Sequence, residues 1–164
     1  MKDLIQSESR DLAVAISELL DAKKAENVEL YSVTHLSSIA DFFVMASASN
    51  TTQTKALADY IEESLSKIGI KNLRRDGVGE WIVLDYNNVI VHIFTPDAKT
   101  FYHLDKLWND GKNAFSLDAV RKMIEKEEKE AKQKIEKQKK NEIKKTSKKE
   151  DIKKETKKKS SKES

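Results

Sequence analysis

The sequence predicts an α/β or α+β fold in which a single mixed β-sheet is flanked by helices. Segments with apolar residues at helical spacing alternate with short segments rich in β-branched and aromatic residues, in the order helix–strand–strand–helix–strand–strand–strand–helix. Both Trp, all four Tyr and all five Phe lie before residue 117. Because a core needs such large apolar side chains, we expect the fold to be confined to that part of the chain.

Charge divides the chain at the same place. Residues 1–117 hold 12 Lys/Arg and 17 Asp/Glu, a net charge of −5, whereas residues 118–164 hold 19 and 11, a net charge of +8. The body can bury one core, but the tail has too few apolar residues to offset the entropy of ordering. We therefore expect one domain at 1–117 and a Lys/Glu-rich tail at 118–164. Glu and Lys four residues apart favour a helix to about Lys140, with disorder beyond.

Local signals place the elements that precede residue 80. The expected elements are a helix at 7–23, a strand at 28–33, a strand at 42–46, a helix at 51–68 and a short strand around 70–74. The apolar stripe of the first helix is Leu12, Ile16, Leu19 and Leu20. Consecutive apolar residues predict that the second strand is buried on both faces. Asn50 can cap the second helix, and Gly69 can end it in the left-handed conformation.

A β-hairpin follows, formed by two β-rich segments on either side of Asn87-Asn88. Asn tolerates the positive φ that a two-residue hairpin turn requires, so strands are expected at 81–86 and 89–94. Thr95 and Pro96 then predict the cap and the first position of a last body helix. The apolar stripe of this helix is Phe101, Leu104, Leu107 and Trp108.

The hairpin has two unequal faces, because cross-strand partners share a face. One face is almost wholly aliphatic and suits packing under helices: Ile82, Leu84, Tyr86, Val89, Val91 and Ile93. The other face combines aromatic, acidic and imidazole side chains: Trp81, Val83, Asp85, Ile90, His92 and Phe94. Either another element covers this second face, or it is a docking surface with aromatic anchors and a polar rim.

Motifs for catalysis or cofactor binding are not apparent, so we expect no enzyme, no catalytic residue, no cofactor and no metal. The four Gly have no phosphate-binding spacing, and His35, His92 and His103 have no second ligand at helical or hairpin spacing. Nucleotidyltransferases pair a Gly-Ser turn with carboxylates that hold two metal ions. Here the turn at 46–49 has no Gly, and Asp85 lacks its second carboxylate.

The localisation is expected from what the sequence lacks. It contains no Cys, which excludes disulfides and thiolate metal sites. No apolar segment approaches the roughly 20 residues that span a membrane, and the first residues lack the apolar segment of a signal peptide. We therefore expect a cytoplasmic bacterial protein without membrane contact.

Four blocks of the sequence resemble the Iojap family of ribosomal silencing factors, in the same order and with similar spacing. The blocks are Ile39-Ala40-Asp41-Phe42-Phe43-Val44-Met45-Ala46-Ser47, the helical Ala56-Leu57-Ala58-Asp59, the hairpin segments Trp81-Ile82-Val83-Leu84-Asp85-Tyr86 and Val91-His92-Ile93-Phe94, and Lys99-Thr100-Phe101-Tyr102-His103-Leu104-Asp105-Lys106-Leu107-Trp108. The resemblance covers about residues 8–110. It departs at turns, where Ala48 and Asn87-Asn88 replace the family's glycine-containing pairs. The tail beyond Phe115 has no counterpart in the family pattern.

The resemblance implies a nucleotidyltransferase-like fold without a catalytic site. It also implies binding to the large ribosomal subunit through ribosomal protein uL14, which blocks association with the small subunit and represses translation under nutrient limitation. Family members can self-associate when free, so a homodimer of the free chain is implied as well. Together with the unequal hairpin faces, the resemblance predicts seven partner-binding residues: Trp81, Val83, Asp85, His92, Phe94, Tyr102 and Trp108.

Two other functions are open at this level. A catalytic enzyme related to nucleotidyltransferases would need nucleotide and metal, and a general RNA-binding protein would act through the basic tail. The tail is either a solubilising extension or an electrostatic contact with ribosomal RNA.

Overall fold

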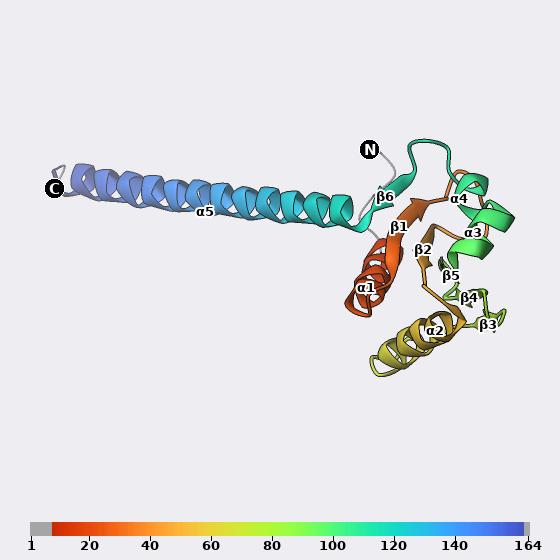
Figure 1. Cartoon of the computed structure of the whole chain (residues 1–164). Helices are drawn as coiled ribbons and strands as arrows, with labels where there is room; N and C mark the ends of the chain where they lie inside the picture. Colours follow the sequence, from red (N-terminus) through yellow and green to blue (C-terminus); the bar gives the residue numbers. More distant parts are fainter. Residues whose placement is uncertain (1–7, 163–164) are drawn as a thin grey trace. The chain divides into compact units, whose positions relative to one another are not determined.

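The computed structural model describes residues 8–162, without the side chains of residues 104–105 and 159–162. In chain order (Figure 1), its elements are α1 (Glu8–Ala22), β1 (Glu26–Ser32), β2 (Phe42–Ser47), α2 (Thr51–Ser66), β3 (Arg74–Asp76), β4 (Trp81–Asp85), β5 (Val89–Phe94), α3 (Pro96–Tyr102), α4 (Leu104–Leu107), β6 (Ala114–Ser116) and α5 (Leu117–Lys162). Ser7, where the first helix is expected to begin, lies outside the described residues. The short strand expected around 70–74 lies slightly later, and β6 is an additional strand.

Six strands form one sheet in the order β3-β4-β5-β2-β1-β6. β2 and β5 are parallel, with Phe42 opposite Val89, and the other neighbouring pairs are antiparallel. β2 lies in the interior of the sheet and all its residues are buried, as its consecutive apolar residues predict. The predicted mixed sheet flanked by helices is therefore confirmed.

Helices α1 and α2 cover one face of the sheet. α1 packs against β1 and β2, α2 packs against β4 and β5, and the two helices contact each other. Beneath them lies the face predicted to be aliphatic, and all six of its hairpin residues are buried. The expected cross-strand pairs are present, including Ile82 with Ile93 and Leu84 with Val91. Each such side chain contributes roughly 1.5–3 kcal/mol by burial, which makes this face the principal core.

Side-chain caps set the starts of two helices as predicted. The Asn50 side chain accepts a 2.8 Å hydrogen bond from the backbone N–H of Gln53 at the start of α2. Gly69, with φ at +83°, follows the end of that helix. Thr95 caps α3, and Pro96 is its first residue. Because each cap satisfies a backbone donor that the helix leaves unpaired, the chain enters both helices at a defined position.

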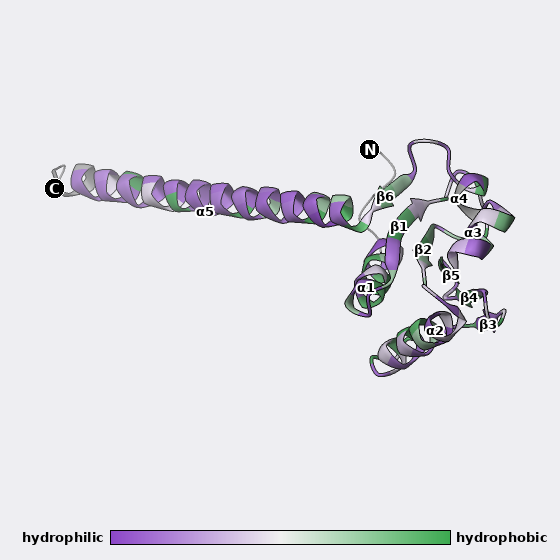
Figure 2. Cartoon of the chain, in the orientation of Figure 1, coloured by the Kyte–Doolittle hydropathy of each residue, from purple (hydrophilic) through white to green (hydrophobic). Residues whose placement is uncertain are grey.

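The tail is helical throughout its described length. α5 continues to Lys162, so the prediction of disorder beyond Lys140 is wrong. Residues 117–162 contain no Gly or Pro and many Lys and Glu, which are good helix formers. Glu125 and Lys129 form one of the predicted ion pairs, at 2.9 Å. Figure 2 shows that this helix is hydrophilic along most of its length.

Contacts divide the chain into two units, one that ends at Val120 and one that begins at Arg121. The first turn of α5 therefore belongs to the body, where Leu117 and Val120 are both buried. The division lies slightly later than the change in composition at residue 117, because these two apolar residues stand at the head of a charged segment.

A chain that ends at Val120 is expected to unfold cooperatively, with nearly the stability of the full chain. It keeps every strand and every aromatic residue. A chain that ends at Leu117 also loses the buried Val120 side chain, and its free energy of unfolding is expected to be lower by about 1–3 kcal/mol. Urea unfolding of both truncated chains measures this difference. If the longer truncated chain has no cooperative transition, the body depends on residues after 120.

Candidate partner-binding surface

The second face of the sheet carries a smaller core that is only partly covered. Its buried residues are Tyr31, Val33, Ala40, Phe43, Met45, Phe94 and Ala98. Ala98 comes from α3, which brings this helix against the second face. Trp81 and Trp108 pack at the edge of this core and are partly exposed. On β4, every second residue is partly exposed on this side, so the second face is open along β4.

Six rings lie in one continuous series that leads from the surface into this second core. The series is Phe101, Tyr102, Trp81, His92, Phe43 and Trp108. Adjacent ring centroids are between 4.9 and 6.0 Å apart. Aromatic pairs at such separations attract one another beyond simple burial. The exposed rings are therefore held in place by the buried ones.

The turn between β3 and β4 places Trp81 at the start of its strand. Gly77 has φ at +82°, and a Cβ at this position would collide with the backbone carbonyl oxygen of Trp81. Trp81 pairs with Phe94 across the hairpin, and its indole Nε1–H donates to Nδ1 of His92 at 3.3 Å. The backbone, the cross-strand partner and the imidazole together orient the Trp81 ring.

His92 is a buried imidazole beneath Trp81. Burial lowers its pKa from 6.5 to about 4, so the ring is neutral at pH 7. Because Nδ1 accepts from Trp81, the proton of the neutral ring is on Nε2, which is buried and has no hydrogen-bond partner among the described residues. His92 and Phe94, two of the predicted partner-binding residues, thus lie inside the second core and support the surface from below.

The free energy of unfolding is expected to fall as the pH drops from about 6.5 to about 4, in part because of His92. The unfolded chain takes up a proton on this imidazole near pH 6.5, but the folded chain does so only near pH 4, so acid favours unfolding across this interval. The full shift corresponds to about 3 kcal/mol. Urea unfolding of the wild-type chain and of His92→Phe between pH 7 and pH 4 measures it. Equal losses in both chains would assign the acid sensitivity to other groups.

The last body helix is broken at His103, so the prediction of one continuous helix is wrong. His103 has φ at +50°, in the left-handed region, and separates α3 from α4. Phe101 is 76% exposed and Leu107 is 66% exposed, while the side chain of Leu104 lies outside the described ones. Helical periodicity places Phe101 on the apolar stripe of the predicted helix and so misses it as a surface residue. The available signal was the presence of two adjacent aromatics, Phe101 and Tyr102.

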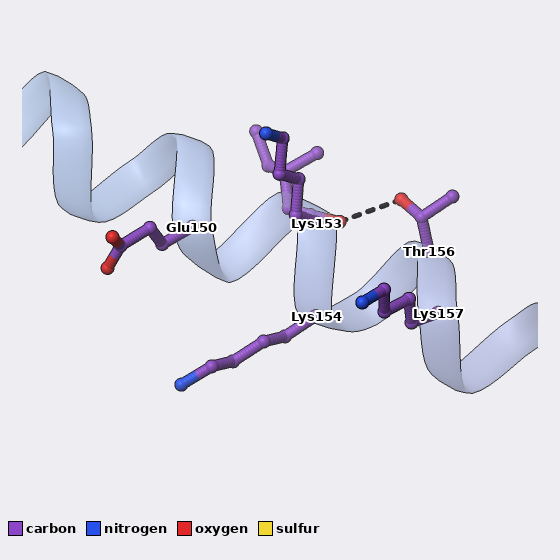
Figure 3. Close-up of a pocket in the computed structure, with 6 residues that line it drawn as sticks. Glu150, Lys153, Lys154, Thr156 and Lys157 are labelled. Atoms are coloured by element: carbon purple, nitrogen blue, oxygen red, sulfur yellow. Dashed lines mark hydrogen bonds between the residues drawn. The ribbon is translucent and has the colours of Figure 1, made fainter.

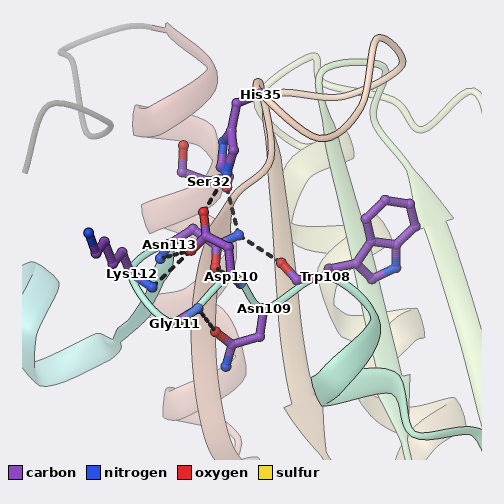
Figure 4. A network of polar contacts seen from close by, with 8 residues as sticks. All are labelled: Ser32, His35, Trp108, Asn109, Asp110, Gly111, Lys112 and Asn113. Carbon is purple, nitrogen blue, oxygen red and sulfur yellow. Dashed lines mark hydrogen bonds and ion pairs between the residues drawn. The ribbon is translucent and has the colours of Figure 1, made fainter.

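Asn113 holds the segment that carries Trp108 (Figure 4). Its buried side-chain amide donates to the carbonyl oxygens of Trp108, at 2.7 Å, and of Ser32, at 3.0 Å. Its Oδ1 accepts from the backbone N–H of Asp110, and the Asp110 carboxylate lies 2.6 Å from Nε2 of His35. Sequence reasoning assigned no role to Asn113, because its partner Ser32 is distant in the chain. The network joins β1 to the segment after α4 and thereby positions Trp108.

The structure does not bring together the two parts of a nucleotidyltransferase-like site. Ser47 lies in the same cross-strand row as Phe94 and Trp81, whereas Asp85 lies in the row of Ile90, four residues along the strand. That offset is at least about 13 Å. Within the described part of the chain, no group of three or more His, Cys, Asp or Glu side chains could hold a metal ion. A search of the same residues finds no helix with the length and apolar character to cross a membrane.

An open hollow is present on α5 (Figure 3). Its lining residues are Glu150, Ile152, Lys153, Lys154, Thr156 and Lys157. They come from two turns of a single helix, and the only hydrogen bond drawn among them is the local one from Thr156 Oγ1 to the Ile152 carbonyl. A hollow without an opposite wall cannot enclose a small ligand.

Four of the seven residues predicted for partner binding are at least partly exposed and form one group. Three of them share a strand, and the fourth contacts one of these three. Trp81, Val83 and Asp85 are partly exposed on β4, and Tyr102 is 51% exposed beside Trp81. We define the aromatic surface as these four residues together with Phe101. Exposed aromatic side chains with a carboxylate at the rim are typical of protein-binding surfaces.

Comparison with known proteins identifies the family. A family profile described as "Ribosomal silencing factor during starvation" matches residues 6–162. The chain belongs to this family. Membership places this silencing factor among the regulators of translation. The profile also extends along the tail, so the expectation that the tail has no counterpart in the family pattern is wrong.

Individual silencing factors match just over half of the chain. "Ribosomal silencing factor RsfS" of Halalkalibacterium halodurans is 34% identical over 93 residues, which are 56% of this chain and 80% of that protein. The protein of the same name in Haemophilus influenzae is 33% identical over 95 residues, 57% of this chain and 93% of that protein. "Protein Iojap, chloroplastic" of Zea mays is 26% identical over 108 residues, 63% of this chain and 46% of that protein. The predicted resemblance to the Iojap family is confirmed.

Solved structures share the fold of this silencing factor. A crystal structure of a protein from Chromobacterium violaceum aligns with a TM-score of 0.60 at 25% identity and covers 62% of this chain and 87% of that chain. A crystal structure of a protein from Bacillus halodurans aligns with a TM-score of 0.50 at 31% identity and covers 60% of this chain and 90% of that chain.

Proposed function

We propose that this silencing factor docks onto ribosomal protein uL14 of the large ribosomal subunit, blocks association with the small subunit and so represses translation under nutrient limitation. The observation that carries the proposal is the aromatic surface, which lies within the blocks that resemble the Iojap family and whose residues are exposed or partly exposed. The chain acts in the cytoplasm by binding, with no catalytic residue and no cofactor.

The chemistry of the aromatic surface supports a protein partner. Interface energy is concentrated in Trp, Tyr and other large side chains that become fully desolvated, and Trp81 and Tyr102 are already in contact at a ring separation of 5.2 Å. Asp85 adds a carboxylate at the edge of the surface. The body carries a net charge of −5, which complements a basic ribosomal protein and favours rapid association with it.

The geometry also favours binding over nucleotidyl transfer. A two-metal phosphoryl site needs its carboxylates close to the phosphate-binding turn. Here Asp85 ends β4 and Ser47 ends β2, but these strands run in opposite directions, so the two residues lie at opposite edges of the sheet. The surface that is accessible is aromatic.

Sedimentation of purified ribosomal subunits through sucrose gradients tests the proposal. We expect the chain to co-sediment with large subunits and to reduce the amount of joined ribosomes, whereas Trp81→Ala does neither. If the chain co-sediments but joined ribosomes form in the usual amount, the proposed block is wrong. If it fails to co-sediment with large subunits, the proposed docking is wrong.

Two further contacts belong to the proposal. The basic tail contacts ribosomal RNA, and the free chain forms a homodimer. Sedimentation equilibrium of the free chain over a range of concentrations tests the dimer, because a chain that keeps the mass of one protomer at all concentrations does not self-associate.

A further inference from the structure

Charge is unevenly distributed along α5. Residues 118–136 hold six Lys/Arg and six Asp/Glu, a net charge of zero. Residues 137–158 hold 11 Lys and four Asp/Glu, a net charge of +7, and all of them are exposed. We define residues 118–136 as the neutral segment and residues 137–158 as the distal segment. Between residues 118 and 158, the net positive charge therefore belongs to the distal segment.

We propose that the distal segment is a binding site for the phosphate backbone of RNA, and that the neutral segment is a helical spacer that does not bind. Phosphate binding follows from the residues themselves. The choice of RNA over DNA rests on the proposed function, because a silencing factor that docks on the large subunit meets ribosomal RNA there.

The spacing of the charges distinguishes the two segments. In the neutral segment, positions four apart repeatedly join opposite charges, as in the pairs 125–129, 128–132 and 130–134. In the distal segment, the same spacing repeatedly joins Lys to Lys: the pairs are 140–144, 144–148, 145–149, 149–153, 153–157 and 154–158. Like charges at this spacing destabilise a helix, and bound phosphates relieve their repulsion. A polyanion therefore stabilises the distal segment and does little for the neutral one.

The arrangement of the lysines indicates contact with the backbone of the RNA. Lys153 and Lys154 project to different sides of the helix (Figure 3). The lysines therefore do not form a single face that could contact base edges in a groove. The tail also has no aromatic residue on which a base could stack. What the distal segment offers is charge, which binds phosphates without regard to sequence and depends strongly on salt.

An anionic membrane surface is the competing polyanion. A helix that lies on a membrane needs one continuous apolar face. The large apolar residues of the distal segment are Ile143 and Ile152, which are nine positions apart and therefore about 180° apart around the helix. Because they cannot enter a bilayer together, the distribution favours RNA.

The neutral segment has the properties of a spacer. Its part beyond the body, residues 121–136, corresponds to about 24 Å of helix at 1.5 Å per residue. The 2.9 Å ion pair between Glu125 and Lys129 is one of the attractive contacts that support it. A stiff spacer lets the distal segment and the aromatic surface act as two separate binding modules, and two linked modules bind more tightly than either alone.

Two full-chain variants test the proposal with matched charge. The distal variant carries Lys→Gln at Lys144, Lys145, Lys148 and Lys149. The neutral-segment variant carries Lys→Gln at Lys122, Lys126, Lys132 and Lys134. Both lose four positive charges, and Gln has nearly the helix propensity of Lys, which circular dichroism checks. Binding of a labelled single-stranded oligouridylate is measured between about 50 and 200 mM salt.

The distal variant is expected to bind the oligouridylate at least about tenfold more weakly, with a salt dependence flatter by up to about 3 in log–log slope. The neutral-segment variant is expected to match the wild-type chain. Equal losses of affinity in both variants would show that binding depends on the overall charge of the chain and not on the position of the lysines, which overturns the proposal. It is also overturned if neither variant loses affinity, or if vesicles of anionic phospholipid bind the full chain more tightly than the oligouridylate does.

Binding to isolated uL14 separates this proposal from the proposed function. The distal variant is expected to bind uL14 as the wild-type chain does, since its aromatic surface is unchanged. If the wild-type chain fails to bind uL14 but its RNA affinity still depends on the distal lysines, the distal site stands and the proposed docking falls.

Discussion

Replacement of Trp81 by Ala is expected to weaken binding to uL14 by about 30- to 1000-fold, or roughly 2–4 kcal/mol. Trp81 connects the exposed and buried halves of the ring series, because it contacts Tyr102 on one side and donates to His92 on the other. Removal of the indole takes away the largest side chain of the aromatic surface and leaves Tyr102 with Phe101 as its one remaining ring neighbour in the series. Titration of purified uL14 with the wild-type and variant chains measures the loss.

Two further variants make this measurement specific. Trp81→Phe keeps a ring but loses the Nε1–H donor to His92, so it separates packing from the hydrogen bond. Val78→Ala, at a 92% exposed position in the turn before Trp81, should leave both binding and stability unchanged. Because Trp81 also borders the second core, each variant is melted as well. A folded Trp81→Ala chain with full affinity would place the docking site elsewhere.

Replacement of Ile82 by Ala is expected to lower the free energy of unfolding by roughly 2–5 kcal/mol. Ile82 is fully buried beneath α2 and pairs with Ile93, so the lost atoms leave a cavity in the principal core. Val83→Ala is the matched control, since the next residue points to the opposite, partly exposed face, and its cost should be below about 1 kcal/mol. Urea unfolding measures both. A larger loss in Val83→Ala than in Ile82→Ala would mean that the two faces are assigned in reverse.

The parts of the fold that could be predicted depend on residues close together in the sequence. The hairpin register follows from a short turn at Asn87-Asn88, and both helix caps act within three residues of Asn50 or Thr95. These signals do not require knowledge of the distant chain. For the same reason, the alternation of faces along β4 predicted that Trp81 and Ile82 lie on opposite sides.

The parts that could not be predicted depend on contacts between distant segments. β6 is only three residues long, and it exists because it pairs with β1. The left-handed conformation occurs at His103 and not at a glycine, so the sequence carries no signal for the break between α3 and α4. The burial of Phe94 likewise depends on α3 packing back onto the sheet.

The tail was mispredicted for a different physical reason. Disorder was expected because the segment cannot bury a core, but a single helix satisfies its backbone hydrogen bonds internally and needs no core to do so. The high content of charged residues does not prevent helix formation. Its uneven distribution distinguishes the neutral segment from the distal segment of one helix.

The parallel ladder between β2 and β5 has a consequence for the order in which the sheet forms. On one side of the ladder, β1 and β2 are consecutive antiparallel strands, and on the other side β3, β4 and β5 are as well, so each group can assemble locally. The two groups meet along the ladder that begins with Phe42 opposite Val89, and the closed loop between these two residues contains α2, β3 and β4. Closing that loop costs conformational entropy, and this cost precedes the stabilising contacts that the ladder makes. We therefore expect the ladder to form more slowly than either group, and the principal core beneath α1 and α2 to be complete only after it.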